Sequence, residues 1–241
     1  MDAQIQLGER TLSYRLRRSA RRRTIAIEID PREGLLVHSP ARVDVDGLRR
    51  FLLQKADWIL ATTAKLDQAR ARAPVVSWES GSRVPLRGGE VTLRVQPGAA
   101  RPAVSLDAEG MLVCTPHEDG LVPAGERVRA LVVGWLREHA AEVVAARVQA
   151  YLPRLAVQPR TVRVREQKRR WGSCSAGGAL NFNWRLILAP AEVLDYVVVH
   201  ELCHLKELNH SPRFWAEVAG ILPAYREPRA WLRNNSLLLD I

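Results

Sequence analysis

The sequence predicts an α+β fold, and three observations support this prediction. Strand-like and helical stretches are mixed along the first half of the chain, and a strand-rich segment is followed by helices in the second half. The chain has 241 residues, 47% of them apolar and 26% charged, as is typical of globular proteins. This length is sufficient to bury a core without disulfides. We expect an N-terminal strand and helix region over residues 1–120 and a compact C-terminal domain over residues 121–241.

Residues 1–152 are predicted to contain several short strands and two helical segments. Apolar and polar residues alternate within residues 11–30, which end in TIAIEID, and GLLVHSP at 34–40 follows a turn. Both stretches therefore predict strands. Apolar residues recur at helical spacing over 46–66, which predicts a helix. After a stretch rich in Gly, Pro and Ser, the pattern predicts strands within 91–116, then a helix over about 125–152.

Two segments of this region resemble each other. LLVHSP at 35–40 is similar to MLVCTP at 111–116, and each lies after strand-like residues and before a helix that carries one tryptophan, Trp58 or Trp135. The pattern suggests a duplicated strand–strand–helix unit, with chance similarity as the rival explanation.

The C-terminal region is predicted to form a β-hairpin followed by helices. TVRVREQKRRWGSC at 161–174 and ALNFNWRLILAP at 179–190 read as two strands around a SAGG turn. Pro190 suits the first turn of a helix that runs to about Leu208. Two closing helices are predicted at SPRFWAEVAGIL and YREPRAWLRNNSLLL.

The helix after Pro190 contains a group of ionisable residues in apolar surroundings. His200 and His204 are four residues apart and therefore project from one face, and Glu201 lies about 100° round at its rim. This HExxH spacing suits a metal held by two imidazoles, with a carboxylate beside it to accept a proton from water. Ionisable residues in a buried helix are costly unless they are paired or bound to metal. The alternative is a core helix whose histidines have ordinary hydrogen-bond partners.

His210 is the candidate third ligand. On a continuous helix it would face about 240° away from His204. Asn209 can adopt a left-handed conformation and end the helix, and Ser211-Pro212 reads as the start of the next one, so the chain can turn back toward the metal. Catalytic zinc typically has three protein ligands and one water, which three histidines would satisfy.

These motifs resemble those of the YgjP-like zinc metallopeptidases, a family related to the SprT-like proteases and the gluzincins. The resemblance rests on HELCHLKELNHSPRFW and the preceding KRRWGSCSAGGALNFNWRLILAP. It is strong over 165–232 and less specific in the N-terminal half. It implies a zincin-like metallohydrolase domain over 121–241, with an active-site helix beside a β-hairpin whose WGSC strand lies next to it.

The resemblance also implies the roles of individual residues. One zinc ion per chain would be held by His200, His204 and His210, with Glu201 as catalytic base. Gluzincins take a glutamate from a later helix as third ligand, for which Glu217 is the nearest candidate. A metzincin is disfavoured, because no methionine follows the histidines.

The expected mechanism is hydrolysis by metal-activated water. Zinc lowers the pKa of its bound water from 15.7 to about 7, and Glu201 would accept the proton. Tyr225 is a candidate oxyanion stabiliser, with packing as its alternative role. The strand ALNFNW could pair with an extended peptide, which would make Asn181 and Asn183 substrate neighbours rather than ordinary sheet residues. Trp171 is a further candidate substrate contact.

The charge balance leaves two other functions open. Lys and Arg exceed Asp and Glu by 36 to 26, and the densest basic runs lie at 15–23 and 165–170. These runs are either solvated strand faces or a surface for phosphate groups. The preferred substrate is a peptide or protein. The rivals are a nucleoside-triphosphate (UTP-type) pyrophosphatase, which the family resemblance also suggests, and a DNA-associated protein with a non-catalytic zinc, although structural zinc sites are usually rich in cysteine.

The remaining features predict a cytoplasmic protein without a membrane anchor. Cys114, Cys174 and Cys203 are odd in number and contain no CxxC pair, so no disulfide framework is indicated. The first residues lack the apolar stretch of a signal peptide, and no apolar run is long enough to span a bilayer.

Overall fold

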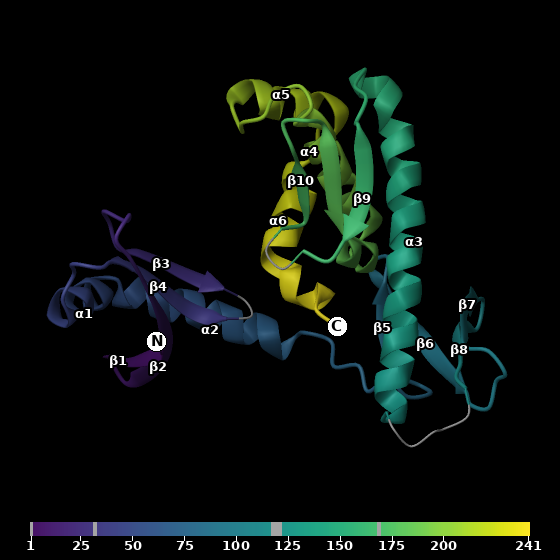
Figure 1. Ribbon diagram of the computed structural model, residues 1–241, viewed down its shortest axis with the longest axis horizontal. Coiled ribbons are helices and arrows are strands. Elements are labelled where there is room, and N and C mark those ends of the chain that lie inside the picture. The colour runs from purple at the N-terminus through teal and green to yellow at the C-terminus, as the bar shows by residue number, and fades with distance from the viewer. Residues whose placement is uncertain (1, 31–32, 117–121, 168–169) are drawn as a thin grey trace. The chain divides into compact units, whose positions relative to one another are not determined.

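The protein has a mixed α+β fold in two compact units. The computed structural model describes residues 2–30, 33–116, 122–167 and 170–241 (Figure 1). The contacts between Cα atoms divide the chain into Met1–Ala73 and Pro74–Ile241. This boundary lies well before residue 120, where the sequence analysis drew it. The strands between the two positions share one hydrophobic core with the later helices.

The first unit consists of one sheet and two helices. Strands β1 (Asp2–Leu7), β2 (Arg10–Ser19), β3 (Ala26–Asp30) and β4 (Gly34–Pro40) form a sheet of order β1-β2-β4-β3, in which only β2 and β4 pair in parallel. The helix predicted over 46–66 is two helices, α1 (Val45–Gln54) and α2 (Ala56–Ala71), because the backbone of Lys55 leaves the helical conformation. The core joins residues of β1 and β4 to Leu48 and Leu52 of α1 and Ile59 of α2.

The second unit begins with a sheet of the same topology. Strands β5 (Arg83–Leu86), β6 (Gly89–Gln96), β7 (Ala103–Asp107) and β8 (Gly110–Cys114) have the order β5-β6-β8-β7, and again only the pair β6 and β8 is parallel. The strands predicted at 34–40 and within 91–116 are therefore confirmed.

Each of the two sheets also has its own ion pair, at an equivalent place. Arg15 of β2 binds Glu33 at 3.0 Å, and Arg94 of β6 binds Glu109 in the equivalent turn. In each turn the backbone N–H of the glutamate donates to an aspartate side chain at 2.8 Å. Repetition of strand order and of this ion pair supports the duplication suggested by the sequence.

The long helix α3 (Ala124–Leu155) confirms the helix predicted over 125–152 and runs along the second unit (Figure 1). Its buried residues recur every three or four positions, from Val128 to Leu155, so one stripe of the helix faces the core. It ends at Ala156, which adopts a left-handed conformation with φ of 50°.

A three-stranded sheet beside α3 leads to the histidine-bearing helix. Strands β9 (Thr161–Arg165), β10 (Gly172–Cys174) and β11 (Ala179–Asn183) have the order β10-β11-β9. The single strand predicted over 161–174 is therefore two strands, β9 parallel and β10 antiparallel to β11. The chain leaves the sheet between them, and the Asn183 amide donates to the carbonyls of Gln167 and Arg170.

The C-terminal helices surround this sheet. The short helix η1 (Trp184–Leu188) leads into α4 (Ala191–Cys203), which is followed by α5 (Pro212–Ile221), α6 (Arg226–Asn235) and η2 (Ser236–Leu239). Nine residues of α4 are buried, and α4 packs against α3, α5, α6 and β10. It ends about five residues earlier than predicted, with His204 as its C-cap. Among the described residues, no helix combines the length and apolar character that crossing a membrane requires.

Candidate metal centre

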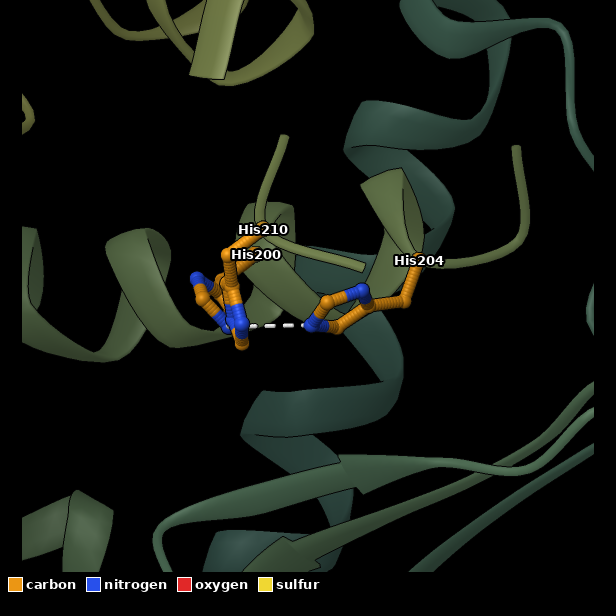
Figure 2. A group of neighbouring side chains, drawn as sticks. All are labelled: His200, His204 and His210. Carbon is orange, nitrogen blue, oxygen red and sulfur yellow. Dashed lines mark hydrogen bonds between the residues drawn. The ribbon is translucent and has the colours of Figure 1, made fainter. Parts of the chain in front are cut away.

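Three histidine rings converge at the C-terminal end of α4. The Nε2 atom of His200 lies 3.2 Å from Nε2 of His204 and 3.1 Å from Nε2 of His210. Figure 2 shows the rings of His200 and His210 close together, with the His204 ring pointing at them from the opposite side. All three can offer a ring nitrogen to one metal ion, since these atoms lie within 4.8 Å of one another.

The segment after α4 brings His210 back to the first two histidines. The backbone N–H groups of Lys206 and Glu207 both bond to the carbonyl of Cys203, so the chain turns immediately after the helix. The side chain of Asn209 then accepts a hydrogen bond from the N–H of Ser211 at 3.0 Å, and the Ser211 hydroxyl caps α5. The predicted start of α5 at Ser211 is confirmed. The predicted left-handed conformation of Asn209 is wrong, because its side chain, rather than its backbone angle, makes the turn.

Hydrogen bonding orients the His204 ring. Its Nδ1 lies 2.9 Å from the carbonyl oxygen of Glu207, which can only accept, so Nδ1 carries the proton. The Nε2 atom is then left with a free lone pair directed at His200 and His210. A ring N–H bonded to a backbone carbonyl is the usual support of a metal-binding histidine.

Two aromatic residues of α5 form a wall against the rings. Phe214 is fully buried and stacks on His204, with ring centroids 4.4 Å apart and an interplanar angle of 26°. Trp215 stacks on His210 at 5.7 Å and 25°. The sequence analysis assigned no function to either residue, although their positions four and five residues after His210 place them on the first turn of the new helix.

The surroundings of His200 and His210 favour the neutral form of both rings. Burial, followed by the neighbouring His204 and His210, lowers the pKa of His200 to about 3. Burial and the neighbouring His204 also lower the pKa of His210, and the positive charge of Arg229 contributes to both shifts. Neutral imidazole is the form that binds metal.

Glu201 lies beside this cluster in a confined space. The residue is 5% exposed, and its Oε2 atom has no hydrogen-bond partner among the described residues. Burial raises the pKa of its carboxyl to about 8, an effect that Arg170 opposes. Its side chain rests against the backbone of β10, where a Cβ atom at Gly172 would be 2.6 Å from Glu201 Cγ and 2.8 Å from Cδ. This close approach requires glycine in the WGSC segment.

The geometry fits a divalent metal ion. Ligand nitrogens at about 2.0–2.1 Å from a tetrahedral zinc are about 3.3 Å apart, close to the 3.1 and 3.2 Å found here. Without an ion, Nε2 of His200 would face two ring nitrogens, and it cannot donate to one and accept from the other at once. The buried Oε2 atom of Glu201 also has no hydrogen-bond partner within the described part of the chain.

Two predicted substrate contacts lie inside the sheet. Strand β11 is central, since β10 and β9 occupy its two edges, so the predicted pairing of a peptide with β11 is wrong. Asn183 is 3% exposed, and its side chain is used by the protein itself, because it also accepts from the backbone N–H of Arg185 at 3.1 Å. The Asn181 amide donates to the Ser173 hydroxyl at 3.4 Å.

The other candidates lie outside the histidine cluster. Trp171 is half-buried just before β10, and its carbonyl accepts from the N–H of Asn183 at 2.8 Å. Tyr225 is buried and stacks on Trp215 at 5.3 Å, one ring removed from the histidines. The carboxylate of Glu217, the alternative third ligand, accepts from Lys206 at 2.8 Å.

The cysteines take no part in the cluster. Cys203 is fully buried, which raises the pKa of its thiol to about 12, and all three cysteines are free.

Comparisons with known proteins identify the family of the chain. The chain is similar to the crystal structure of the metallopeptidase zymogen abylysin from Pyrococcus abyssi, with 26% identity and a TM-score of 0.34 over 37% of this chain and 93% of that one. For the metallopeptidase zymogen jannalysin from Methanocaldococcus jannaschii, the identity is 21% and the TM-score 0.35, over 39% of this chain and 96% of that one. The search of curated proteins found no match. The family described as YgjP-like, metallopeptidase domain matches residues 23–235, and the chain therefore belongs to this family.

Proposed function

We propose that the protein is a zinc-dependent metallopeptidase with a zincin-like catalytic domain. In this proposal His200, His204 and His210 hold one zinc ion, and Glu201 is the general base. The observation that carries it is the convergence of three ring nitrogens at 3.1 to 3.2 Å beside a buried carboxylate with an unpartnered oxygen. Membership of a metallopeptidase family supports the reaction class.

The protein supplies the ligands and the base from one short segment. A zinc ion bound to three imidazoles supplies Lewis-acid activation of water and of a substrate carbonyl. Glu201 follows His200 directly on α4, so its carboxylate stands at the rim of the metal-binding face. Because none of the described residues bonds to Oε2, we propose that this atom accepts a proton from water and returns it to the leaving amine. The buried ring of Phe214 covers one face of the His204 ring.

We propose that an extended peptide pairs with β10 instead of β11. Strand β10 is the edge of its sheet and packs against α4, which carries His200 and Glu201. Addition of a peptide strand to such an edge uses main-chain hydrogen bonds and tolerates varied side chains. This arrangement would bring a scissile peptide bond next to Glu201. We also propose a cytoplasmic location, because all three cysteines are free thiols.

The decisive experiment measures zinc and activity together. The purified protein should contain about one zinc ion per chain. His210→Ala should contain little, and Glu217→Ala, which removes the partner of Lys206, should retain zinc. Glu201→Gln should keep zinc and lose about 10²- to 10⁴-fold in the hydrolysis of casein. Zinc retained in His210→Ala but lost in Glu217→Ala would disprove the proposed third ligand. Absence of zinc from the reconstituted parent would disprove the metal site.

A second reaction deserves the same assay. The net charge of +10 would suit an anionic nucleotide, so UTP hydrolysis should be measured beside casein hydrolysis. We expect cleavage of casein and no release of pyrophosphate. A DNA-associated protein with a non-catalytic zinc is the third possibility, and full function of Glu201→Gln together with tight, salt-dependent DNA binding would favour it.

A further inference from the structure

Helix α6 presents a row of arginines that the proposed chemistry does not use. Arg226, Arg229 and Arg233 are spaced at i, i+3 and i+7, so they share one face of the helix. All three are exposed, and together with Ala230 they line a groove of about 260 Å³. The opposite face of α6 is buried through Pro228 and Leu232.

These arginines have no carboxylate partner among the described residues. Some other arginines of the second unit form ion pairs, as Arg94 does with Asp107 and Glu109. Among the residues that the structure describes, the only hydrogen bond from the three guanidinium groups runs from Arg233 to the neighbouring Asn234. The groove therefore carries three guanidinium groups without an ion-paired carboxylate from the described part of the chain.

Arg229 is held close to the histidine cluster. Its guanidinium carbon lies 4.4 Å from the centroid of the Trp215 ring, the geometry of a cation–π contact. The same ring stacks on His210 at 5.7 Å and lies 5.9 Å from His200. The Trp215 side chain thus separates the Arg229 guanidinium from the proposed metal ligands His200 and His210.

We propose that the groove of Arg226, Arg229 and Arg233 is an anion subsite that binds an acidic group of the substrate beside the metal. This inference rests on the proposed function and extends it to substrate specificity. Guanidinium groups present paired N–H donors that match the two oxygens of a carboxylate or phosphate. Because the chain belongs to a metallopeptidase family, the favoured source of the anion is a Glu or Asp side chain of a peptide. The phosphates of a nucleotide are the other source of the same chemistry.

The test measures binding in a form of the protein that cannot cleave its ligand. The Glu201→Gln variant is loaded with zinc and titrated against two end-blocked, tetramethylrhodamine-labelled hexapeptides that differ only in two Glu or two Gln residues. Fluorescence anisotropy at low and moderate salt gives the dissociation constants. Arg229→Gln, and then the triple change of all three arginines, are introduced in this background. ATP is titrated as a competitor.

A matched control separates the groove from general charge. Arg163 of β9 is exposed and forms no ion pair with another described residue, so Arg163→Gln removes the same charge from β9 instead of α6. We expect Arg229→Gln to weaken binding of the Glu peptide about fivefold and the triple change to weaken it at least tenfold. Binding of the Gln peptide to these variants should change by less than about twofold, and so should binding of either peptide to the Arg163→Gln variant. The effect should shrink as salt is added.

The outcomes are distinct. A loss of affinity that is confined to the Glu peptide supports binding of a peptide carboxylate in the groove. A loss of competition by ATP, with the Glu peptide unaffected, supports an anion subsite that takes phosphate. Equal effects of Arg229→Gln and Arg163→Gln on both probes would overturn the proposal. Zinc content is measured on the same samples, so failure of the metal site is detected separately from failure of the groove.

Discussion

Gly172→Ala tests how β10 positions the proposed catalytic base. The added Cβ would lie 2.6 Å from Cγ of Glu201, about 0.9 Å short of the roughly 3.5 Å at which carbon atoms make favourable contact. Glu201 is buried where α4 packs against β10, so its side chain has to move by about that distance. A misplacement on the order of 1 Å in a catalytic group costs about 10²-fold in rate. We therefore expect kcat to fall about 100-fold.

The assay is steady-state hydrolysis of a peptide substrate, with zinc content and thermal melting measured on the same samples. The metal ligands are separate from the contact, so zinc should stay at about one per chain, and KM should change less than kcat. Gly177→Ala is the matched control in the neighbouring turn, because the nearest atom to its added Cβ is 3.9 Å away. It should keep its activity within about twofold of the parent.

A double variant shows whether the effect passes through Glu201. In the Glu201→Gln background the base is already removed, so adding Gly172→Ala should cause little further loss of rate. Full activity of Gly172→Ala would refute the reasoning, since the close contact would then have no effect on the base. Loss of zinc in Gly172→Ala would also refute it, because β10 would then position the ligands rather than Glu201.

Two further predictions concern the stability of the second unit. Phe214→Leu, which removes the ring stacked on His204, should lower the free energy of unfolding by on the order of 1–3 kcal/mol. The loss, measured by urea unfolding, should be greater with zinc than with a chelator, because the ring also orients the His204 ligand. Equal losses under the two conditions would contradict this. The pKa of Glu166 is lowered, chiefly by the hydrogen bond from Arg185, so the folded state favours the carboxylate. The contribution of this ion pair to the free energy of unfolding is therefore present at neutral pH and lost as the pH falls below the ordinary value of 4.5. Glu166→Gln should therefore cost roughly 1 kcal/mol at pH 7, a figure reduced for its partial exposure, and less at pH 3; the same loss at both pH values would argue against this ion pair.

Local patterns predicted much of the fold because they depend only on neighbours in sequence. The helix α3, the strand β4 and the start of α5 at Ser211 were predicted from local sequence patterns, and the structure confirms them. Sequence periodicity did not show the break at Lys55 or the separation of β9 from β10. Both depend on how the chain packs against other elements, which local spacing does not encode.

For the candidate site, the sequence by itself determined the chemistry and the tertiary structure decided the geometry. Helical spacing is sufficient to place His200 and His204 on one face, with Glu201 at its rim, because all three lie within one turn and a half. The contact of Gly172 with Glu201 and the stacking of Arg229 on Trp215 join residues 29 and 14 positions apart. These distances are set by packing between separate elements. Only the folded chain could therefore show why β10 has a glycine and that Arg229 of α6 lies on the ring of Trp215.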